Sequence, residues 1–282
     1  LHSFPFTIPF PGTLHVIEKT EFPMIPQVSF CGLQISRLIL GANPFGGFSH
    51  QSKERDAAMV AYNTVERIKE TWARAEKAGI TTMITNNETP HVIQAVREYR
   101  AEKGALQWIA QINCRTKPNM EAAIDEAVEI GCKALYFHGA LTDDAYARKD
   151  DKQLRSWCDH ARKRGVPAGL AGHSPDAHRW AYDNGIADFH VVCFFNCGSL
   201  HAGKGHKFRL ADMAEAVRAI QYIKKPCIGY KIMGAGRIDP RMAFEYAFEN
   251  IKPTDAVNVG MHRGDKDGMV EENVSMVEEI LK

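Results

Sequence analysis

The sequence predicts an α/β protein that folds as a (β/α)8 barrel, also called a TIM barrel, with an N-terminal extended arm and hairpin. Three observations predict this fold. The chain has 282 residues, which suits one barrel of about 250 residues with a short extension. Eight short apolar runs alternate with amphipathic segments, and such alternation is typical of a parallel sheet. The runs are apolar throughout, as expected of strands that are buried on both faces.

The N-terminal stretch forms the expected arm. It is rich in proline and phenylalanine and begins with residues such as Phe4, Pro5 and Phe6. Proline removes a backbone donor and clashes with the preceding helical turn, so a regular helix is excluded. We expect residues 1–27 to be an extended arm that packs on the barrel or on a neighbouring subunit, and residues 28–282 to be the barrel domain.

Each apolar run is predicted to be a barrel strand. The runs are Leu38–Ala42, Thr81–Thr85, Leu106–Ile112, Ala134–His138, Pro167–Ala171, Phe189–Phe195, Cys227–Ile232 and Ala256–Val259. Helical periodicity is clearest over Met120–Ile130 and Met213–Ile223. Glycines that suit a left-handed helix C-cap stand before the next strand; they are Gly79, Gly104, Gly131, Gly165 and Gly185. An open doubly wound sheet is the alternative, but no Gly-x-Gly-x-x-Gly turn follows the first strand, which disfavours its dinucleotide-binding version.

The composition excludes some classes of partner. The formal net charge is +1, so no strong field would attract nucleic acid or an anionic membrane. No apolar run approaches the roughly 18 residues that span a bilayer. The seven cysteines are an odd number and mostly lie in apolar runs, which is typical of reduced thiols. We expect a soluble protein with a small-molecule substrate, cytoplasmic unless an upstream signal was removed, and leave a homo-oligomer open.

Polar side chains follow all eight predicted strands, and in this fold the loops after the strands converge on one mouth of the barrel. Buried polar groups without partners are costly, so a merely structural barrel would have little reason to place them there. The pattern therefore favours an active site at the C-terminal mouth. The residues expected to bind substrate are Asn43, Asn86, Asn87, Gln111, Asn113, Arg115, Asn196, Tyr230 and His262.

Four residues are candidates for catalysis, namely His138, His173, Lys231 and Glu88. Histidine exchanges protons near neutral pH, so His138 and His173 could act on a substrate oxygen, whereas packing roles in the core or beside a helix are the alternatives. Lys231 would serve as a base or Schiff-base amine if it pointed into the mouth, or would extend outward between helices. The two histidines end adjacent strands and could share one divalent metal ion.

Two glycine-rich segments also lie at strand ends. Gly234, Gly236 and Arg237 combine backbone amides with a guanidinium group before a helix, which suits a phosphate or carboxylate of a cofactor. Residues 193–206 contain two cysteines and two histidines, but their spacing fits no closed zinc pattern. A flexible mouth loop is therefore favoured over a metal site in that segment.

The stretch from Ser29 to Gly47 resembles the opening of the aldo-keto reductases, in which a hairpin closes the barrel floor and leads into the first strand. The organisation is similar over residues 28–282. The resemblance implies a nicotinamide cofactor, NAD(P). It also implies that His138 is the catalytic histidine of that family and that Tyr230 is the aromatic residue that stacks on the nicotinamide ring.

Further positions match the cofactor site of that family. Ser174 corresponds to the serine that holds the nicotinamide amide, and the neighbouring Glu272 and Asn273 correspond to the pair that meets the adenine. Arg263, after the last strand, completes the expected cofactor-binding set. Pro175 stands where the family has a second amide-binding residue, an asparagine.

The catalytic set of the family, an Asp, a Tyr, a Lys and a His, is not reproduced. Ile84 stands at the position of the aspartate, residues 86–90 lack the tyrosine, and residues 106–114 lack the lysine. Only His138 matches. Without the tyrosine and lysine, hydride transfer would lack its general acid, whose contribution is about 10²–10⁴-fold.

We therefore expect an enzyme that acts on a small carbonyl or carbohydrate-like substrate by histidine and lysine acid–base chemistry, with or without a metal. A lyase, hydratase or isomerase is favoured. One alternative is a NAD(P)H-dependent reductase with an altered catalytic set, and another is a catalytically silent ligand-binding barrel. Nicotinamide binding and metal content distinguish these three.

Overall fold

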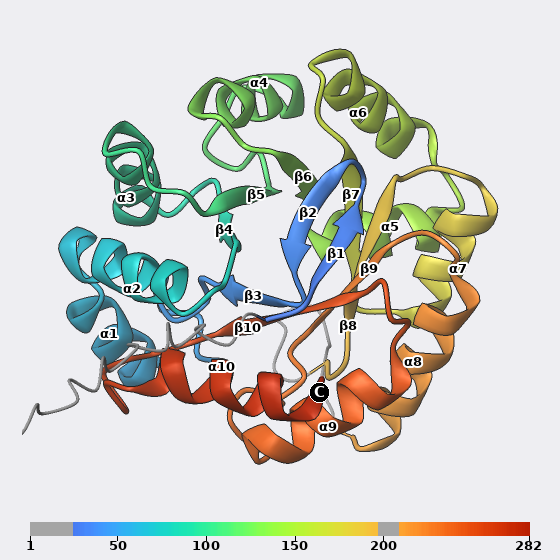
Figure 1. The fold of residues 1–282 in the computed structure, drawn as a ribbon. Coiled ribbons are helices and arrows are strands. Elements are labelled where there is room, and N and C mark those ends of the chain that lie inside the picture. Colours follow the sequence, from blue (N-terminus) through green and yellow to red (C-terminus); the bar gives the residue numbers. More distant parts are fainter. Residues whose placement is uncertain (1–24, 197–208) are drawn as a thin grey trace, which may run out of the picture.

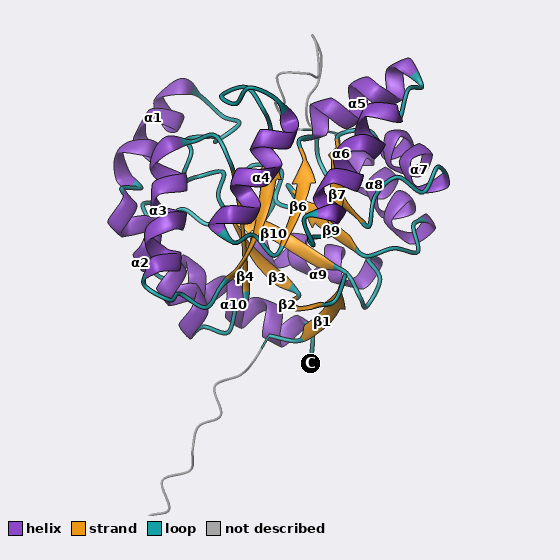
Figure 2. Ribbon diagram, turned by 90° about the horizontal axis from the view of Figure 1, so that it is seen from above, coloured by secondary structure: helices purple, strands orange, loops and turns teal. Residues whose placement is uncertain are grey.

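A closed parallel barrel is the centre of the structure. The computed structural model describes residues 25–196 and 209–282, and eight strands close in the order β10-β3-β4-β5-β6-β7-β8-β9 (Figure 1, Figure 2). The predicted (β/α)8 barrel is therefore confirmed. The strands are β3 (Leu38–Gly41), β4 (Thr82–Asn86), β5 (Gln107–Ile112), β6 (Ala134–Phe137), β7 (Ala168–Gly172), β8 (Phe189–Cys193), β9 (Cys227–Tyr230) and β10 (Ala256–Gly260).

Helices surround the barrel, with two helices after β3 and after β6 and one after the other strands. The predicted helix over residues 120–130 is confirmed to the residue, and that over residues 213–223 begins two residues earlier. The first of these helices begins at a polar N-cap, because the side chain of Asn119 accepts from Ala122 N at 2.8 Å. The helices are α1 (Lys53–Tyr62), α2 (Val65–Lys77), α3 (Pro90–Ala101), α4 (Met120–Ile130), α5 (Gly139–Arg148), α6 (Lys152–Lys163), α7 (Pro175–Asp183), α8 (Ala211–Tyr222), α9 (Pro240–Asn250) and α10 (Met269–Ile280).

The predicted hairpin is also present and closes one end of the barrel. Strands β1 (Gln27–Phe30) and β2 (Leu33–Ser36) pair antiparallel and cross the barrel opening in Figure 1. Cys31 and Gly32 form the turn with φ values of 48° and 84°, the left-handed pair that a tight hairpin requires. The ring of Phe30 packs edge-on against Phe189, with centroids 4.7 Å apart. Most of the expected arm, residues 1–24, lies outside the described residues.

Two apolar clusters lie on opposite faces of the sheet and fix the orientation of every strand. The inner cluster fills the barrel with residues such as Ile39, Ile109 and Val191, and the outer cluster, with residues such as Leu40 and Trp108, packs against the helices. Because side chains alternate along a strand, a residue two places after an inner residue also faces inward. This alternation decides which strand-end residues reach the mouth.

Four predicted strands end earlier than the apolar runs suggest, and the run 38–42 stops one residue short at Gly41. The run 227–232 stops at Tyr230 because Lys231 adopts φ 56°, which breaks the extended backbone. The run 189–195 stops at Cys193. His138 leaves β6 to become the N-cap of α5, where its Nδ1 accepts from Ala140 N at 3.3 Å.

Four of the five predicted left-handed glycines have positive φ, and Gly104 does not. There the left-handed residue is Lys103, with φ 64°. The reason for glycine at position 104 is close packing, since a Cβ atom there would lie 2.1 Å from Cζ of Tyr99. Tyr99 in turn donates to Glu76 Oε2 across neighbouring helices.

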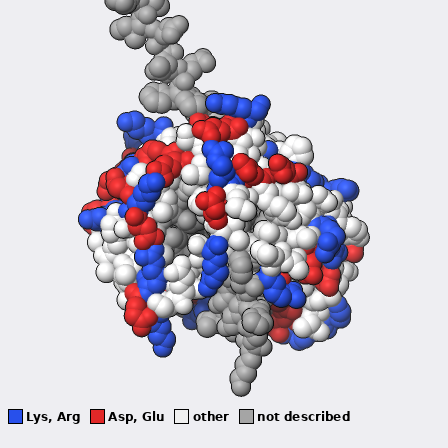
Figure 3. Space-filling view, turned by 90° about the horizontal axis from the view of Figure 1, so that it is seen from below, with Lys and Arg blue, Asp and Glu red and all other residues white. Residues whose placement is uncertain are grey.

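The surface carries both signs of charge. Basic and acidic side chains are interspersed over the face seen in Figure 3, in keeping with the net charge of +1. None of the helices described for residues 25–196 and 209–282 is long and apolar enough to cross a membrane. The six cysteines in these ranges are free thiols.

A buried histidine pair supports β7 and β8 from the outside of the barrel. His178 Nε2 donates to Gly172 O at 3.3 Å, and the two Nδ1 atoms of His178 and His190 are 3.2 Å apart. A carbonyl only accepts, so neutral His178 carries its proton on Nε2 and its Nδ1 must accept from His190 Nδ1. Burial lowers the pKa of His178 to about 4 and, with the nearby His178 ring, lowers the pKa of His190.

Acid should therefore destabilise the protein through this pair. The unfolded chain binds a proton at each histidine below pH ~6.5 while folded His178 does not until pH falls toward 4, so stability is complete above that window and lost as pH drops through it. At pH 5, His178 alone should cost about 2 kcal/mol. Urea unfolding at pH 7.5 and pH 5 measures the loss. The double variant His178→Gln, His190→Leu should show a clearly smaller loss between the two pH values, and an unchanged loss would contradict this origin.

Candidate active site

The C-terminal mouth of the barrel is lined by residues from all eight strands. Strand alternation turns Gly41 and a set of polar residues inward, each two places after a residue of the inner cluster. The polar residues of this set are Asn86, Gln111, Tyr136, His173, Cys193, Tyr230 and Asn258. The register pairs several of them side by side, such as Gln111 with Asn86 and Tyr136, and Tyr230 with Cys193 and Asn258.

His173 is held by a carboxylate that sequence analysis did not identify. Its Nδ1 lies 2.7 Å from Oδ2 of Asp143, and the backbone amides of His173 and Ser174 also donate to Asp143. Asp143 lies on α5, thirty residues before His173 in sequence, so no strand-end pattern could reveal it. Burial raises the pKa of Asp143, but the His173 ring and the two amides outweigh it and leave the pKa below its usual value. The carboxylate therefore stays ionised at neutral pH.

The hydrogen bonds also fix the neutral tautomers of two neighbouring histidines. A carboxylate only accepts, so His173 carries its proton on Nδ1 and a lone pair on Nε2. His138 is the reverse, because its Nδ1 accepts from Ala140 N and the proton is therefore on Nε2. The two rings are 6.4 Å apart between centroids. The mouth thus places a ring with an acceptor Nε2 beside a ring with a donor Nε2.

Tyr230 and Lys231 lie next to this pair. The Tyr230 ring centroid is 6.4 Å from that of His173, and its hydroxyl donates to Gly172 O at 3.3 Å. Burial, together with nearby Cys193, raises the pKa of Tyr230 well above its ordinary value, so the hydroxyl remains protonated. The ammonium nitrogen of Lys231 lies 5.7 Å from the Tyr230 ring centroid. The structure therefore brings together His138, His173, Tyr230 and Lys231.

Gln111 faces the same interior through another tyrosine. Tyr136, one strand away, donates its hydroxyl to Gln111 Oε1 at 3.2 Å. Burial raises the pKa of Tyr136, so this hydroxyl also stays a hydrogen-bond donor. The sequence predicts Gln111 as a site residue but not Tyr136, because the tyrosine lies inside an apolar run.

Three predicted substrate-binding amides bind backbone groups of the loops. Asn86 Oδ1 accepts from Glu88 N and Thr89 N at 2.9 and 2.8 Å, which shapes the turn before α3. Asn87 bonds to both backbone groups of Asn113, and Asn113 Oδ1 accepts from the next amide, Cys114 N. These side chains hold the loops after β4 and β5 together.

Glu88, the predicted catalytic carboxylate, also links the loops after β4 and β5. Its Oε1 accepts from Arg115 N at 2.6 Å, and its Oε2 lies 3.3 Å from Arg115 Nε. Asn43 is exposed, with its Nδ2 3.4 Å from His50 Nε2. Asn196 is half-buried, and its Oδ1 has no partner among the described residues.

Two predicted residues after β10 belong to the outer layer. His262 packs edge-on against Tyr62 with centroids 5.1 Å apart, and its Nδ1 accepts from Asn63. Arg263 is buried and ion-paired with Glu70 and Asp267. Both side chains tie the loop after β10 to α1 and α2.

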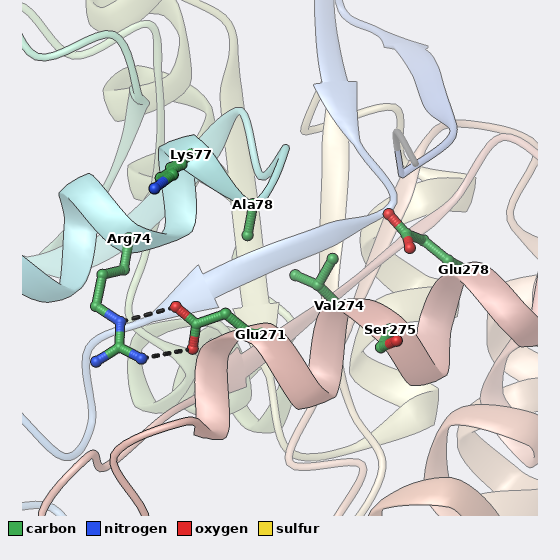
Figure 4. Close-up of a pocket in the computed structure, with 7 residues that line it drawn as sticks. All are labelled: Arg74, Lys77, Ala78, Glu271, Val274, Ser275 and Glu278. Atoms are coloured by element: carbon green, nitrogen blue, oxygen red, sulfur yellow. Dashed lines mark hydrogen bonds and ion pairs between the residues drawn. The ribbon is translucent and has the colours of Figure 1, made fainter. Parts of the chain in front are cut away.

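The predicted adenine-binding residues lie at the start of α10, near a groove between α2 and α10. Glu272 is ion-paired with Lys266 at 2.7 Å, and Asn273 is buried. In the groove, Arg74 binds both carboxylate oxygens of Glu271 (Figure 4). The groove residues are Arg74, Lys77, Ala78, Glu271, Val274, Ser275 and Glu278.

The other predicted cofactor residues are engaged as well. Ser174 Oγ accepts from Ala177 N and caps α7. Arg237 Nη1 donates to Gly234 O, and its Nη2 donates to His50 O. The helix after this turn is capped by the carboxylate of Asp239, which would repel an anion. Gly234 and Gly236 have φ values of 54° and 79°. NAD(P) binding stays a prediction.

A metal site also stays a prediction. Within residues 25–196 and 209–282, no group of three or more His, Cys, Asp and Glu side chains is placed to hold a metal ion. His138 and His173 come together as predicted, but each uses its Nδ1 in the contacts above. Cys197, His201 and His206 lie outside the described residues.

Comparison with known proteins places the fold. No family model and no curated protein matches the chain. A Pseudomonas aeruginosa protein, described as a candidate aldo-keto reductase, has a TM-score of 0.63 and 16% identity over 91% of this chain and 94% of that chain. Glycerol dehydrogenase from Gluconobacter oxydans has a TM-score of 0.56 and 12% identity over 91% and 90%. The DHPS of Yersinia pestis has a TM-score of 0.51 and 12% identity over 91% and 97%. The chain is thus distantly similar in structure to aldo-keto reductases.

Gly139 makes room for the His173 ring, so enlarging it should break the contact with Asp143. A Cβ atom at Gly139 would lie 2.9 Å from His173 Cε1. We expect Gly139→Ala to displace the ring, to abolish the downfield Nδ1–H proton resonance and to cost about 1–3 kcal/mol. Gly268→Ala is the matched control, since a Cβ atom there meets nothing within 4 Å. An unchanged resonance in Gly139→Ala would refute this packing role.

Proposed function

We propose that the chain is an enzyme that moves protons at a carbonyl or hydroxyl group of a small polar substrate in the barrel mouth. The observation that carries this proposal is the complementary pair of histidines. His173, with Asp143 behind it, has an acceptor Nε2, and its ring centroid lies 6.4 Å from that of His138, whose Nε2 carries the proton. An acceptor and a donor side by side suit concerted acid–base catalysis.

The pair supports one specific step. His173 Nε2 takes a proton from the carbon beside a carbonyl, and the C–H electron pair forms a carbon–carbon double bond while the carbonyl π pair moves onto the oxygen. His138 gives its Nε2 proton to that oxygen and is left as an imidazolate until the reverse transfer. The product is an enol or enediol, and both imidazoles are reset by the reverse transfers at the next carbon. Asp143 stabilises the imidazolium that forms on His173. Isomerases and lyases of hydroxy-carbonyl compounds share this step.

A nicotinamide-dependent reductase is the second candidate, and the comparisons favour it. Two of the similar structures are described as a candidate aldo-keto reductase and a glycerol dehydrogenase, while none cited above is an isomerase. The resemblance in sequence also implies that Tyr230 is the nicotinamide-stacking ring. Against the reductase, three predicted cofactor-binding side chains form hydrogen bonds or ion pairs within the protein, namely those of Ser174, Glu272 and Arg263. Protonation of the substrate oxygen by an imidazole would be common to both candidates.

Loss of the Asp143–His173 pair should abolish proton transfer. Deuterium uptake from D₂O into a panel of small hydroxyaldehydes and hydroxyketones, followed by proton NMR, measures it without a cofactor. We expect His173→Asn and Asp143→Asn to slow exchange by about 10²–10⁴-fold. His160→Asn is the matched control, because His160 forms a similar 2.8 Å contact with Asp125 on the outer surface. Full exchange in His173→Asn would exclude this mechanism.

The second candidate has its own signature. A reductase should enhance the fluorescence of NADPH or NADH on binding, and Tyr230→Ala should weaken that enhancement, because the stacking ring is lost. Wild-type protein without deuterium exchange but with cofactor-dependent carbonyl reduction would select the reductase. Exchange without nicotinamide binding would select the isomerase or lyase.

A further inference from the structure

Asn258 has an amide oxygen that the described residues leave without a hydrogen-bond donor. It lies on β10, between Val257 and Val259 of the outer cluster, so its side chain faces the barrel interior. This Oδ1 is buried and accepts no hydrogen bond from residues 25–196 or 209–282, although the residue as a whole is only half-buried. A Cβ atom at Gly41 would lie 2.6 Å from this oxygen, so the amide occupies space that the glycine leaves open.

The position of Asn258 connects it with the histidine pair. Its register partner on β9 is Tyr230, whose ring stands 6.4 Å from that of His173. Asn258, Tyr230 and His173 therefore follow one another along the inner wall of the mouth. A small molecule bound against this wall would reach from the amide to the imidazole.

The contrast with neighbouring amides indicates a ligand. The oxygens of Asn86, Asn87, Gln111 and Asn113 each accept a hydrogen bond. Only Asn196 Oδ1, after β8, shares with Asn258 Oδ1 the lack of a donor among the described buried amide oxygens at these strand ends. Leaving a buried acceptor without a donor costs about 1–3 kcal/mol, and natural proteins hold few such groups, often at functional sites. Asn258 Oδ1 is such a group within the interior of the described mouth.

We propose that Asn258 is a substrate-binding residue whose Oδ1 accepts a hydrogen bond from a hydroxyl group of the substrate. The substrate class is then a small hydroxylated carbonyl compound, with its hydroxyl at Asn258 and its reacting carbon at His173. The placement of the reacting carbon at His173 rests on the proposed function. The binding role of Asn258 stands independently of it.

The stability of the unliganded protein gives the first test. Asn258→Leu keeps the shape but removes the unpartnered oxygen, and we expect the melting temperature to rise by roughly 2–4 °C. Asn87→Leu is the matched control: it removes an asparagine bonded to both backbone groups of Asn113 and should lower the melting temperature. A fall in Asn258→Leu like that in Asn87→Leu would show a structural amide and overturn the proposal.

Ligand binding gives the second test. Glycerol, D-glyceraldehyde, D-ribose and D-glucose are added in increasing concentration, and the rise in melting temperature reports the affinity of each. We expect at least one to stabilise the wild type and to lose about tenfold in affinity in Asn258→Leu, the equivalent of one hydrogen bond. Equal affinity in the two proteins, or no stabilisation of the wild type by any member, would overturn the proposal.

The two tests separate this inference from the proposed function. Loss of binding in Asn258→Leu together with full deuterium exchange in His173→Asn would keep the binding role and reject the mechanism. Unchanged binding in Asn258→Leu with loss of exchange in His173→Asn would do the reverse.

Discussion

The alternation of side chains along closed parallel strands is the constraint on which the whole site depends. A shift of one residue in β8 would move Phe189 and Val191 out of the barrel and send their neighbours inward, so the inner cluster prevents it. The same apolar residues therefore decide that Cys193 and, on β9, Tyr230 face the mouth. The hairpin adds to this constraint from below, because Phe30 packs against Phe189 at the barrel floor. The polar mouth is thus oriented by the apolar layers beneath it.

The end of β7 joins the buried core to the site. The carbonyl of Gly172 accepts the Tyr230 hydroxyl from inside the barrel and His178 Nε2 from outside. The carboxylate of Asp143 on α5 accepts hydrogen bonds from both the backbone amide and the ring Nδ1 of the next residue, His173. Backbone and side chain are therefore fixed by three separate elements, which is the preorganisation that acid–base catalysis requires. The buried His178–His190 pair belongs to this support, although it lies on the far side of the strand.

The sequence predicts the barrel well because its signals are local. An apolar run marks a strand wherever both faces are buried, and the period of residues 120–130 marks α4 to the residue. His138, His173 and Tyr230 could be predicted together because they end strands that converge. Asp143 could not, since it stands on a helix and its partner is distant in sequence.

Other parts of the site depend on hydrogen bonds that residue types do not encode. Asn87 and Glu88 look like mouth residues, yet their side chains bind the backbone of the next loop. The direction of Lys231 depends on a positive φ value that only the folded chain reveals. Asn258 was not predicted as a site residue, because it lies within an apolar run and the pattern indicates only a strand.

The similarity to aldo-keto reductases is a similarity of fold. The chemistry of the site depends on which side chain can release a proton. In that family a tyrosine acts as the acid beside a lysine. Here burial raises the pKa of both inward-facing tyrosines, Tyr136 and Tyr230. Each hydroxyl donates a hydrogen bond within the protein, the first to Gln111 Oε1 and the second to Gly172 O. They are suited to hold the wall of the mouth in place rather than to protonate a substrate. In the proposed mechanism the two imidazoles transfer the protons instead, and their opposite tautomers are set by Asp143 and by the Ala140 amide at the start of α5. A barrel of this fold without the tyrosine–lysine pair would thus have another route for protonating a carbonyl group, because a donor ring and an acceptor ring stand at the ends of β6 and β7.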